Sequence, residues 1–297
     1  MLTEKTLDRL CCPVCKHYPL EPRSIIKEGD RWVRGELICA PCVSTFPISH
    51  GIPNFMPKEI KSEEENWRVW SKRLRQFDRR IVGWTKEQME HCIPIMEDLF
   101  YHFHPFKGVL LDIGCGDGKP RSFLKEETEY WGIDPGDWVT HPKHTFDVEA
   151  LFPGIKRPFP FFLAVGEYLP FRSQTFDNVL FFSSFDHVQS PREVLRESFR
   201  VLKRGGSIVA LLELSDSQSR IPRSRTENLR TSFQKGISKL SKRDFVGFVK
   251  GAVHTLTEKP DLFFTRKDIE ELFGFFFLDL EIKDLPEGDA FVKARKP

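Results

Sequence analysis

The sequence has few tyrosines, no long apolar run and almost no net charge. It contains 4 Tyr against 28 Phe, so we interpret its aromatic residues as core packing rather than as a binding signal. Its formal net charge of +2 provides no global field that would attract nucleic acid or an anionic membrane. The apolar runs, such as residues 275–278, are too short to span a bilayer. With 40% hydrophobic residues the chain can still build a core. We therefore expect a globular protein rather than a disordered one.

The amino terminus, MLTEKTLDRLCCPVC, lacks the apolar segment of a secretory signal. We therefore expect a cytoplasmic protein, in a compartment where thiols stay reduced. Its cysteine pairs then need an explanation other than disulfides. The sequence contains no internal repeat and no low-complexity tract.

Four of the seven cysteines form two C-x-x-C pairs, Cys12 with Cys15 and Cys39 with Cys42. The 23 residues between the pairs match the spacing of zinc ribbons, in which two tight turns direct four thiolates at one ion. Four protein ligands leave no position for water, so we predict a structural Zn site in a small domain over residues 1–58. A redox-active cysteine pair is the alternative.

The sequence around these cysteines, LDRLCCPVC and ELICAPCVSTFPISHGIPNFMP, carries a resemblance over residues 5–57. It resembles the small zinc-ribbon protein that serves as a separate activating subunit of some RNA and protein methyltransferases. A zinc ribbon also precedes the catalytic domain of certain ribosomal RNA guanine methyltransferases. The resemblance implies a ribbon fused to its catalytic domain in a single chain.

Short apolar runs alternate with amphipathic segments from residue 106 onward. We expect strands at 108–114, 130–134, 159–166, 176–185, 206–213, 275–285 and 289–296, and helices at 117–127, 190–203 and 264–273. Apolar strands that alternate with helices predict an α/β fold with a doubly wound, mostly parallel sheet. This catalytic domain should cover residues 105–297, with a basic helical insertion at about 215–260. Residues 59–104 are charged and helical in pattern, and we expect them to form a linker or cap.

The stretch LLDIGCGDGKP includes the end of the first of these strands and is rich in glycine. A phosphate-binding P-loop would need glycine where the chain has Ile113, and the dinucleotide-binding fingerprint would need glycine in place of Lys119. The pattern D-x-G-x-G-x-G is complete, with Asp112, Gly114, Gly116 and Gly118. At this point the sequence resembles the class I methyltransferases that depend on S-adenosylmethionine (SAM).

The charges of SAM suit this loop. SAM carries a sulfonium, an ammonium and a carboxylate, and it has no phosphate. Glycines let the backbone approach it closely, and Asp112 near the loop attracts a cation whereas it would repel a pyrophosphate. The helix expected after the loop can favour the carboxylate of SAM at its amino terminus.

Later motifs extend the resemblance over residues 108–210. Asp134 ends the second strand, in YWGID, where its carboxylate can accept both ribose hydroxyls. The motifs LPF and FDNV, and then RESFRVLKRGGSIV, match the order of the family. Many members carry an aspartate at the adenine where this chain has Val165, so we expect the backbone of Gly166 or the side chain of Glu167 to substitute. The resemblance implies a cofactor site formed by Asp112, Gly114, Cys115, Gly116, Gly118, Asp134, Val165, Gly166, Glu167 and Ser183.

The acceptor side is expected at SSFDHV, residues 183–188, because class I enzymes place acceptor-facing residues beyond the carboxyl end of the sheet. Asp186 and His187 are the candidate catalytic residues, with the carboxylate orienting the imidazole as a base. The alternative is that this pair only caps or packs a helix that begins at Ser190 and Pro191. No N-P-P-Y or D-P-P-Y motif and no cysteine follows the fourth strand, which disfavours methylation of base N6 or C5.

Three functions stay open. The first is methylation of an oxygen or nitrogen of a small-molecule, glycan or lipid-linked acceptor, which motifs like those of ubiquinone biosynthesis and the near-neutral charge favour. The second is an RNA methyltransferase whose ribbon and basic segments, residues 67–86 and 218–250, hold RNA; those segments are otherwise solvated helix faces. The third is a non-catalytic SAM-binding scaffold whose ribbon recruits a partner. The oligomeric state does not follow from the sequence.

Overall fold

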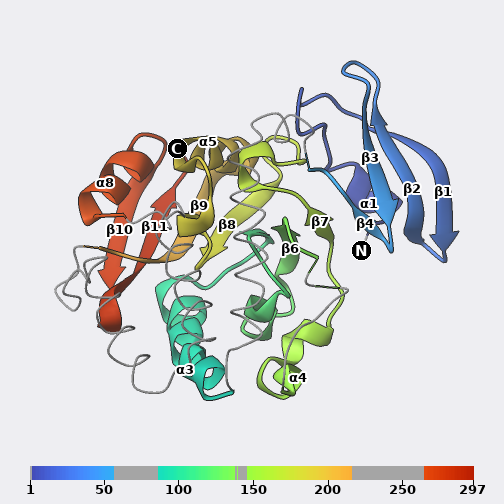
Figure 1. Cartoon of the computed structure of the whole chain (residues 1–297). Coiled ribbons are helices and arrows are strands. Elements are labelled where there is room, and N and C mark those ends of the chain that lie inside the picture. The colour runs from blue at the N-terminus through green and yellow to red at the C-terminus, as the bar shows by residue number, and fades with distance from the viewer. Residues whose placement is uncertain (1, 57–85, 138, 140–145, 216–263) are drawn as a thin grey trace, which may run out of the picture.

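The computed structural model describes residues 2–56, 86–137, 139, 146–215 and 264–297 (Figure 1). Several regions named above lie almost entirely outside these ranges. They are the basic segments 67–86 and 218–250, the expected insertion, and the first half of the expected linker. Within them no helix is long and apolar enough to cross a membrane. Two sheets organise the described chain, a small one near the amino terminus and a large one after residue 108.

The amino-terminal domain is an antiparallel sheet in the order β1-β2-β3-β4. Its elements are α1 (Glu4–Leu7), β1 (Glu21–Glu28), β2 (Arg31–Cys39), β3 (Ser44–Ser49) and β4 (Ile52–Pro53). A capping box fixes the start of α1, since Thr3 and Thr6 each accept the backbone N–H of the other. The loop between α1 and β1 carries the first cysteine pair, and the end of β2 with the turn after it carries the second, so the sheet presents both pairs at one end.

The large sheet has the strand order β10-β11-β9-β8-β5-β6-β7. The strands are β5 (Val109–Ile113), β6 (Glu129–Asp134), β7 (Phe161–Leu163), β8 (Phe176–Phe182), β9 (Leu202–Glu213), β10 (Leu278–Asp284) and β11 (Asp289–Arg295). Neighbours from β7 to β9 run parallel, and β11 is antiparallel to both β9 and β10. The strand order reverses between β5 and β8, and ligands of such sheets bind outside the carboxyl ends of the strands at that point.

Helices cover both faces of the large sheet (Figure 1). Neighbouring residues of a strand alternate between two buried clusters, as Leu110 and Leu111 do. The cluster of Leu111 includes side chains of α5 and α8, and the cluster of Leu110 includes side chains of α3, a π-helix and α4. These helices are α3 (Lys86–Glu97), the π-helix (Asp98–Phe103), α4 (Val148–Leu151), α5 (Pro191–Val201) and α8 (Arg266–Gly274). The prediction of a doubly wound, mostly parallel α/β sheet is confirmed.

Short 3₁₀ turns connect several strands: η3 (Lys119–Ser122), η4 (Pro153–Lys156), η5 (Gly166–Tyr168), η6 (Phe185–His187) and η8 (Pro286–Gly288). The prediction of a helix at 117–127 is wrong, because the only helical turn in that segment is η3. The buried Arg121 side chain donates to the backbone carbonyls of Asp117 and Gly118. A side chain thus takes carbonyls that an α-helix would pair with amides four residues on. No α-helix amino terminus therefore lies at the glycine loop.

The amino-terminal domain packs against β7 through backbone pairs and aromatic rings. Asn54 pairs with Leu163 in parallel register, and the N–H of Phe55 donates to the Leu163 carbonyl at 2.8 Å. The ring of Phe55 lies 5.0 Å from that of Phe46 and 6.1 Å from that of Phe162, centroid to centroid. All three rings belong to one buried cluster, so the two domains share a continuous core.

Candidate cofactor and metal sites

The glycine loop connects β5 to η3 and has a left-handed backbone at three positions. Gly114, Gly116 and Gly118 have φ angles of +78°, +54° and +77°, which glycine adopts without strain. A Cβ at Gly114 would lie 2.5 Å from the Cβ of Ser184, and one at Gly118 would lie 2.7 Å from Nε of Arg121. A Cβ at Gly116 would meet no described atom within 4 Å. An open glycine between two packed ones lets a ligand approach the backbone closely.

Asp134 ends β6 and holds this loop in place. Its Oδ2 accepts the Gly116 N–H at 3.0 Å, and its Oδ1 accepts the Gly136 N–H at 2.8 Å. Carboxylate oxygens accept hydrogen bonds, and ribose hydroxyls can donate them. The position of Asp134 beside the open glycine is therefore compatible with the predicted ribose contact.

Asp112 lies on β5 directly before the loop and is fully buried. The Tyr130 hydroxyl donates to its Oδ2 at 2.6 Å, while its Oδ1 has no partner among the described residues. Burial, opposed by this hydrogen bond, raises the pKa of Asp112 to about 7. A buried carboxylate oxygen that lacks a partner fits the cationic part of a ligand such as SAM.

The residues expected at the adenine lie at η5, beyond the carboxyl end of β7. Val165 is buried, and a Cβ at Gly166 would press on side chains 3.1 Å away. The carboxylate of Glu167 accepts the backbone N–H groups of Gln189 (2.8 Å) and Ser190 (3.1 Å). Burial raises the pKa of Glu167 despite these hydrogen bonds. This carboxylate thus holds the start of α5, and Val165 and the Gly166 backbone are left for the predicted adenine contact.

Two more residues of the predicted cofactor site make packing or hydrogen-bond contacts within the protein. Cys115 is buried, and a Cβ at Gly132 would come within 2.6 Å of its Sγ. Ser183 has a left-handed φ of +52° and donates its N–H to the Leu211 carbonyl at 3.0 Å. Cys115 therefore packs the glycine loop against β6, and Ser183 fixes the turn after β8.

Three residues around the glycine loop were not predicted from the sequence: Tyr130, Ser184 and Arg121. The register of β5 and β6 places Tyr130 on the same side of the sheet as Asp112, so strand alternation could have indicated this pair. The Ser184 hydroxyl donates to the Ile113 carbonyl at 2.5 Å, from the strand end on the other side of the loop. The contacts of Ser184 and Arg121 depend on tertiary packing, for which the sequence gives no local signal.

Asp186 and His187 lie on η6, which follows β8 at the carboxyl end of the sheet. Phe185 anchors this turn, since its ring is fully buried against Phe181 and Phe273. The two polar side chains are partly exposed, and His187 Nε2 lies 3.8 Å from Asp186 Oδ2. That distance is too long for a hydrogen bond, so the carboxylate acts on the imidazole by charge. The structure brings the pair together, and its catalytic role stays a prediction.

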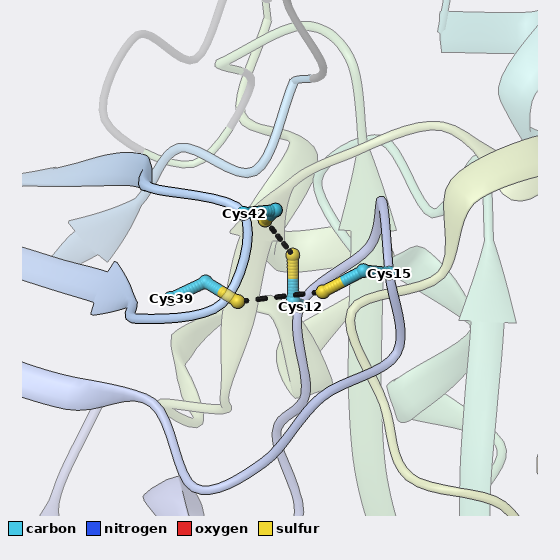
Figure 2. Close-up of side chains that lie close together, drawn as sticks. All are labelled: Cys12, Cys15, Cys39 and Cys42. Atoms are coloured by element: carbon cyan, nitrogen blue, oxygen red, sulfur yellow. Dashed lines mark hydrogen bonds between the residues drawn. The ribbon is translucent and has the colours of Figure 1, made fainter.

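The four cysteines converge at one end of the small sheet (Figure 2). The Sγ atoms of Cys12, Cys15, Cys39 and Cys42 all lie within 4.8 Å of one another. Thiolates at tetrahedral corners about 2.3 Å from one zinc ion would stand about 3.8 Å apart, so the cluster fits a tetrahedral ion. Burial raises the pKa of Cys42, but hydrogen bonding with Ser44 brings it down to about 6.

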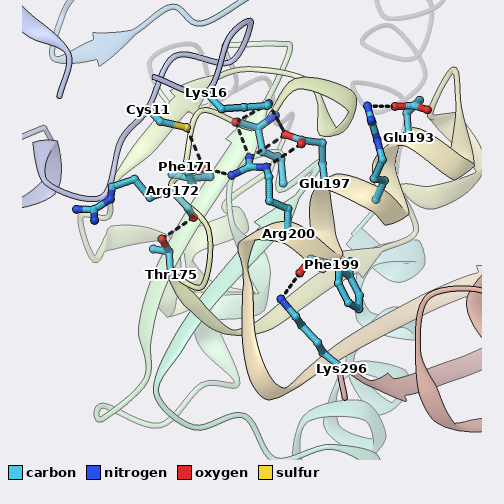
Figure 3. Close-up of polar contacts among 12 residues, drawn as sticks. Cys11, Lys16, Phe171, Arg172, Thr175, Glu193, Glu197, Phe199, Arg200 and Lys296 are labelled. Atoms are coloured by element: carbon cyan, nitrogen blue, oxygen red, sulfur yellow. Dashed lines mark hydrogen bonds and ion pairs between the residues drawn. The ribbon is translucent and has the colours of Figure 1, made fainter. Parts of the chain in front are cut away.

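A buried carboxylate links the first cysteine pair to the large domain (Figure 3). Glu197 of α5 is 3% exposed and forms an ion pair at 2.6 Å with Lys16, which follows Cys15. It also pairs with Arg200 at 2.8 Å and accepts the N–H of Leu169 at 3.0 Å. Burial opposes its charge, but Arg200 and Lys16 together lower the pKa of Glu197. One group therefore joins the cysteine loop, α5 and the segment after η5.

Two known families match this architecture. Residues 111–210 match the family described as a methyltransferase domain, and residues 3–51 match the family described as Trm112p-like protein. The chain carries a class I SAM-dependent methyltransferase domain behind a Trm112p-like domain. The predicted methyltransferase fold and the predicted four-cysteine domain at the amino terminus are confirmed.

Curated relatives resemble parts of the chain. An uncharacterized protein of Methanocaldococcus jannaschii is 29% identical over 148 residues, which cover 50% of this chain and 64% of that protein. Sterol 24-C-methyltransferase of Schizosaccharomyces pombe is 28% identical over 158 residues, which cover 52% of this chain and 41% of that enzyme. This chain thus spans less than two thirds of the length of each of these relatives.

Solved structures also align with the chain. A SAM-dependent methyltransferase from Thermotoga maritima has a TM-score of 0.47 and 16% identity, covering 78% of this chain and 99% of that chain. A protein from Pyrococcus horikoshii has a TM-score of 0.48 and 18% identity, covering 72% of this chain and 93% of that chain.

Replacing Glu197 by glutamine should lower the free energy of unfolding by about 3 kcal/mol, because Lys16 and Arg200 lose the charge that pairs them. This contribution is present above the ordinary pKa of 4.5 and is lost as the pH falls through the lowered pKa of the folded state. Urea unfolding of wild type and variant at about pH 7 and about pH 3 measures both effects, and the difference should shrink at the lower pH.

Glu193→Gln is the matched control, because Glu193 lies one turn earlier on α5 and pairs with Arg196 in an exposed position. Its expected cost is below about 0.5 kcal/mol. Equal losses in the two variants would contradict the role assigned to Glu197.

Proposed function

We propose that this chain transfers a methyl group from SAM to a small-molecule or lipid-linked acceptor. The observation that carries the proposal is the glycine loop at the reversal of strand order, where Gly116 is open and Asp112 offers a buried oxygen that has no partner among the described residues. The sterol 24-C-methyltransferase of Schizosaccharomyces pombe has a sterol as its named acceptor, which supports an acceptor of this class.

SAM supplies a methyl group already activated on its sulfonium, so the protein has mainly to position the two reactants. The backbone at Gly116 allows a close approach of the cofactor, and Oδ1 of Asp112 attracts its positive charge. Asp134, which holds the Gly116 N–H at the end of β6, accepts the ribose hydroxyls. Val165 and the backbone of Gly166 cover the adenine.

His187 is the proposed base for an acceptor that must lose a proton, and the carboxylate of Asp186 lies 3.8 Å from its Nε2. Both lie beyond the carboxyl end of β8, where acceptors of such sheets bind. His187→Gln should then slow methyl transfer by about 100-fold or more and leave SAM affinity intact. An unchanged rate would remove His187 from the mechanism.

Gly116→Ala should weaken SAM binding by about tenfold or more, because the new methyl group would occupy the space proposed for the cofactor. Calorimetric titration with SAM measures this change. Gly29→Ala is the matched control, because Gly29 also has a left-handed φ (+64°) and no described atom within 4 Å, but it lies in the β1–β2 turn. Both variants carry a similar backbone strain of about 1 kcal/mol, so equal SAM affinities would contradict the assignment of the loop.

We also propose that the four-cysteine cluster holds a structural zinc ion, which its tetrahedral spacing supports. Metal analysis should find about one zinc per chain, and Cys12→Ser should lose both the metal and thermal stability. Cys11→Ser is the matched control, because the Cys11 thiol donates to the Phe171 carbonyl at 3.0 Å and lies outside the cluster. A stable wild-type protein without metal, or equal zinc content in both variants, would refute this site.

The acceptor class is tested by incubating the protein with methyl-labelled SAM and a fractionated extract of the source cells. Our proposal expects label in the small-molecule or lipid fraction. RNase-sensitive label would instead identify an RNA methyltransferase, the second candidate, which the Trm112p-like domain favours. Absence of label from every fraction, with a protein that binds SAM, would support a non-catalytic scaffold.

A further inference from the structure

A cavity of about 410 Å³ lies between the Trm112p-like domain and the methyltransferase domain. The small domain contributes residues 31–33 of β2 and residues 50–52 at the β3–β4 turn, and the large domain contributes residues 155–159, Phe161 and Asp117, among others. None of the residues predicted to hold SAM lines it. Its volume is in the range of small-ligand sites, so its chemistry decides what it can hold.

The charged side chains of the lining are mostly basic. They are Arg31, Arg121, Lys156 and Arg157, with Asp117 and Glu149 as the acidic members. Both carboxylates already have a lysine partner, since Lys119 lies 2.7 Å from Asp117 and Lys156 lies 3.0 Å from Glu149. Arg31 has Glu28 as its partner at 3.7 Å, so the excess positive charge of the cavity is carried by Arg121 and Arg157.

Arg121 is 4% exposed and forms no ion pair with the described residues. Its guanidinium donates to backbone carbonyls, those of Asp117, Gly118, Ile155 and Arg157. Arg157 returns a hydrogen bond to the Arg121 carbonyl and also forms no ion pair in the described part of the chain. These neutral oxygens bind both guanidinium groups without cancelling their charge.

A buried cation without a counterion is costly, and a second cation beside it adds to the cost. Burial is the main cause that lowers the pKa of Arg121, the charge of Asp117 opposes it, and the charge of Arg157 lowers the pKa further. The ring of Phe159 offsets part of this cost, because the Arg121 guanidinium lies 4.0 Å from its centroid. An anion in the cavity would supply the charge that both arginines lack.

The remaining wall of the cavity is largely apolar and aromatic, with Trp32, Phe159 and Phe161 among its members. The indole N–H of Trp32 is buried and has no partner within the described ranges. A ligand with a flat or apolar body would fill this part of the cavity, and an acceptor oxygen on it would suit the free N–H.

We propose that this cavity binds a small organic anion, a carboxylate or phosphate on an apolar or aromatic body, at a site separate from that of SAM. The anionic group lies against Arg121 and Arg157, and Arg31 approaches it from the small domain. Because both domains line the site, an occupant also strengthens their association. This inference goes beyond the proposed methyl transfer and does not depend on it.

The test is calorimetric titration of the full chain with three probes that share one ring system: naphthyl phosphate, naphthoate and the uncharged naphthol. Arg31→Gln and Arg157→Gln remove exposed side chains of the lining, whereas Arg121 is left intact because it holds the glycine loop. Each substitution should weaken binding of the anions by about fivefold or more. Arg34→Gln and Arg204→Gln are the matched controls, because both side chains are exposed and neither lines the cavity.

Tighter binding of the phosphate would identify a phosphorylated ligand, and tighter binding of the carboxylate would identify an organic acid. The proposal is overturned if neither anion binds, if naphthol binds as tightly as the anions, or if the lining variants bind like the controls. SAM is titrated into the same variants, where its affinity should stay unchanged. A failure of this site is thereby distinguished from a failure of cofactor binding.

Discussion

The carboxylate of Glu197 lies where three parts of the chain meet, and the arrangement of the two domains depends on it. It accepts the Leu169 N–H, pairs with Arg200 on its own helix and pairs with Lys16 beside the first cysteine pair. Arg200 in turn donates to the carbonyls of Leu169 and Phe171, so side chains fix the backbone that follows η5. A charge this deeply buried is stable only while its partners are present. The cysteine cluster of one domain and the predicted adenine side of the other are thus coupled through one group.

Much of the large sheet could be predicted because each strand is a short apolar run between polar segments. β9 begins at Leu202, before its expected start, because a bulge opposite β8 takes up the residues around Gly205. The helix expected after the glycine loop failed for a different reason. The pattern could not reveal that the Arg121 side chain takes the carbonyls of that segment and becomes buried there. A buried arginine among charged neighbours has no distinct signature in a sequence.

The glycine loop could be predicted because its pattern reflects a local backbone requirement, the left-handed φ at three alternating positions. The role of Glu167 could not be predicted, because the local sequence is the same whether its carboxylate contacts a ligand or holds the start of a helix. Gln189 and Ser190, which decide between them, come more than 20 residues later. The contact between the two domains was equally hidden, since Leu10 pairs with Phe171 and Asn54 with Leu163 across more than 100 residues of chain.

β7 is the outermost strand of the large sheet on the side of the small domain, and it is short and apolar. An outermost strand offers unpaired backbone groups onto which strands of other molecules can add. In this chain Asn54 and Phe55 occupy that position. The opposite border, β10, is exposed and protected differently, by the alternating charges of LDLEIKD. The Trm112p-like domain therefore also covers an edge strand that could otherwise pair with other molecules. A methyltransferase domain produced without it would expose this edge and favour self-association.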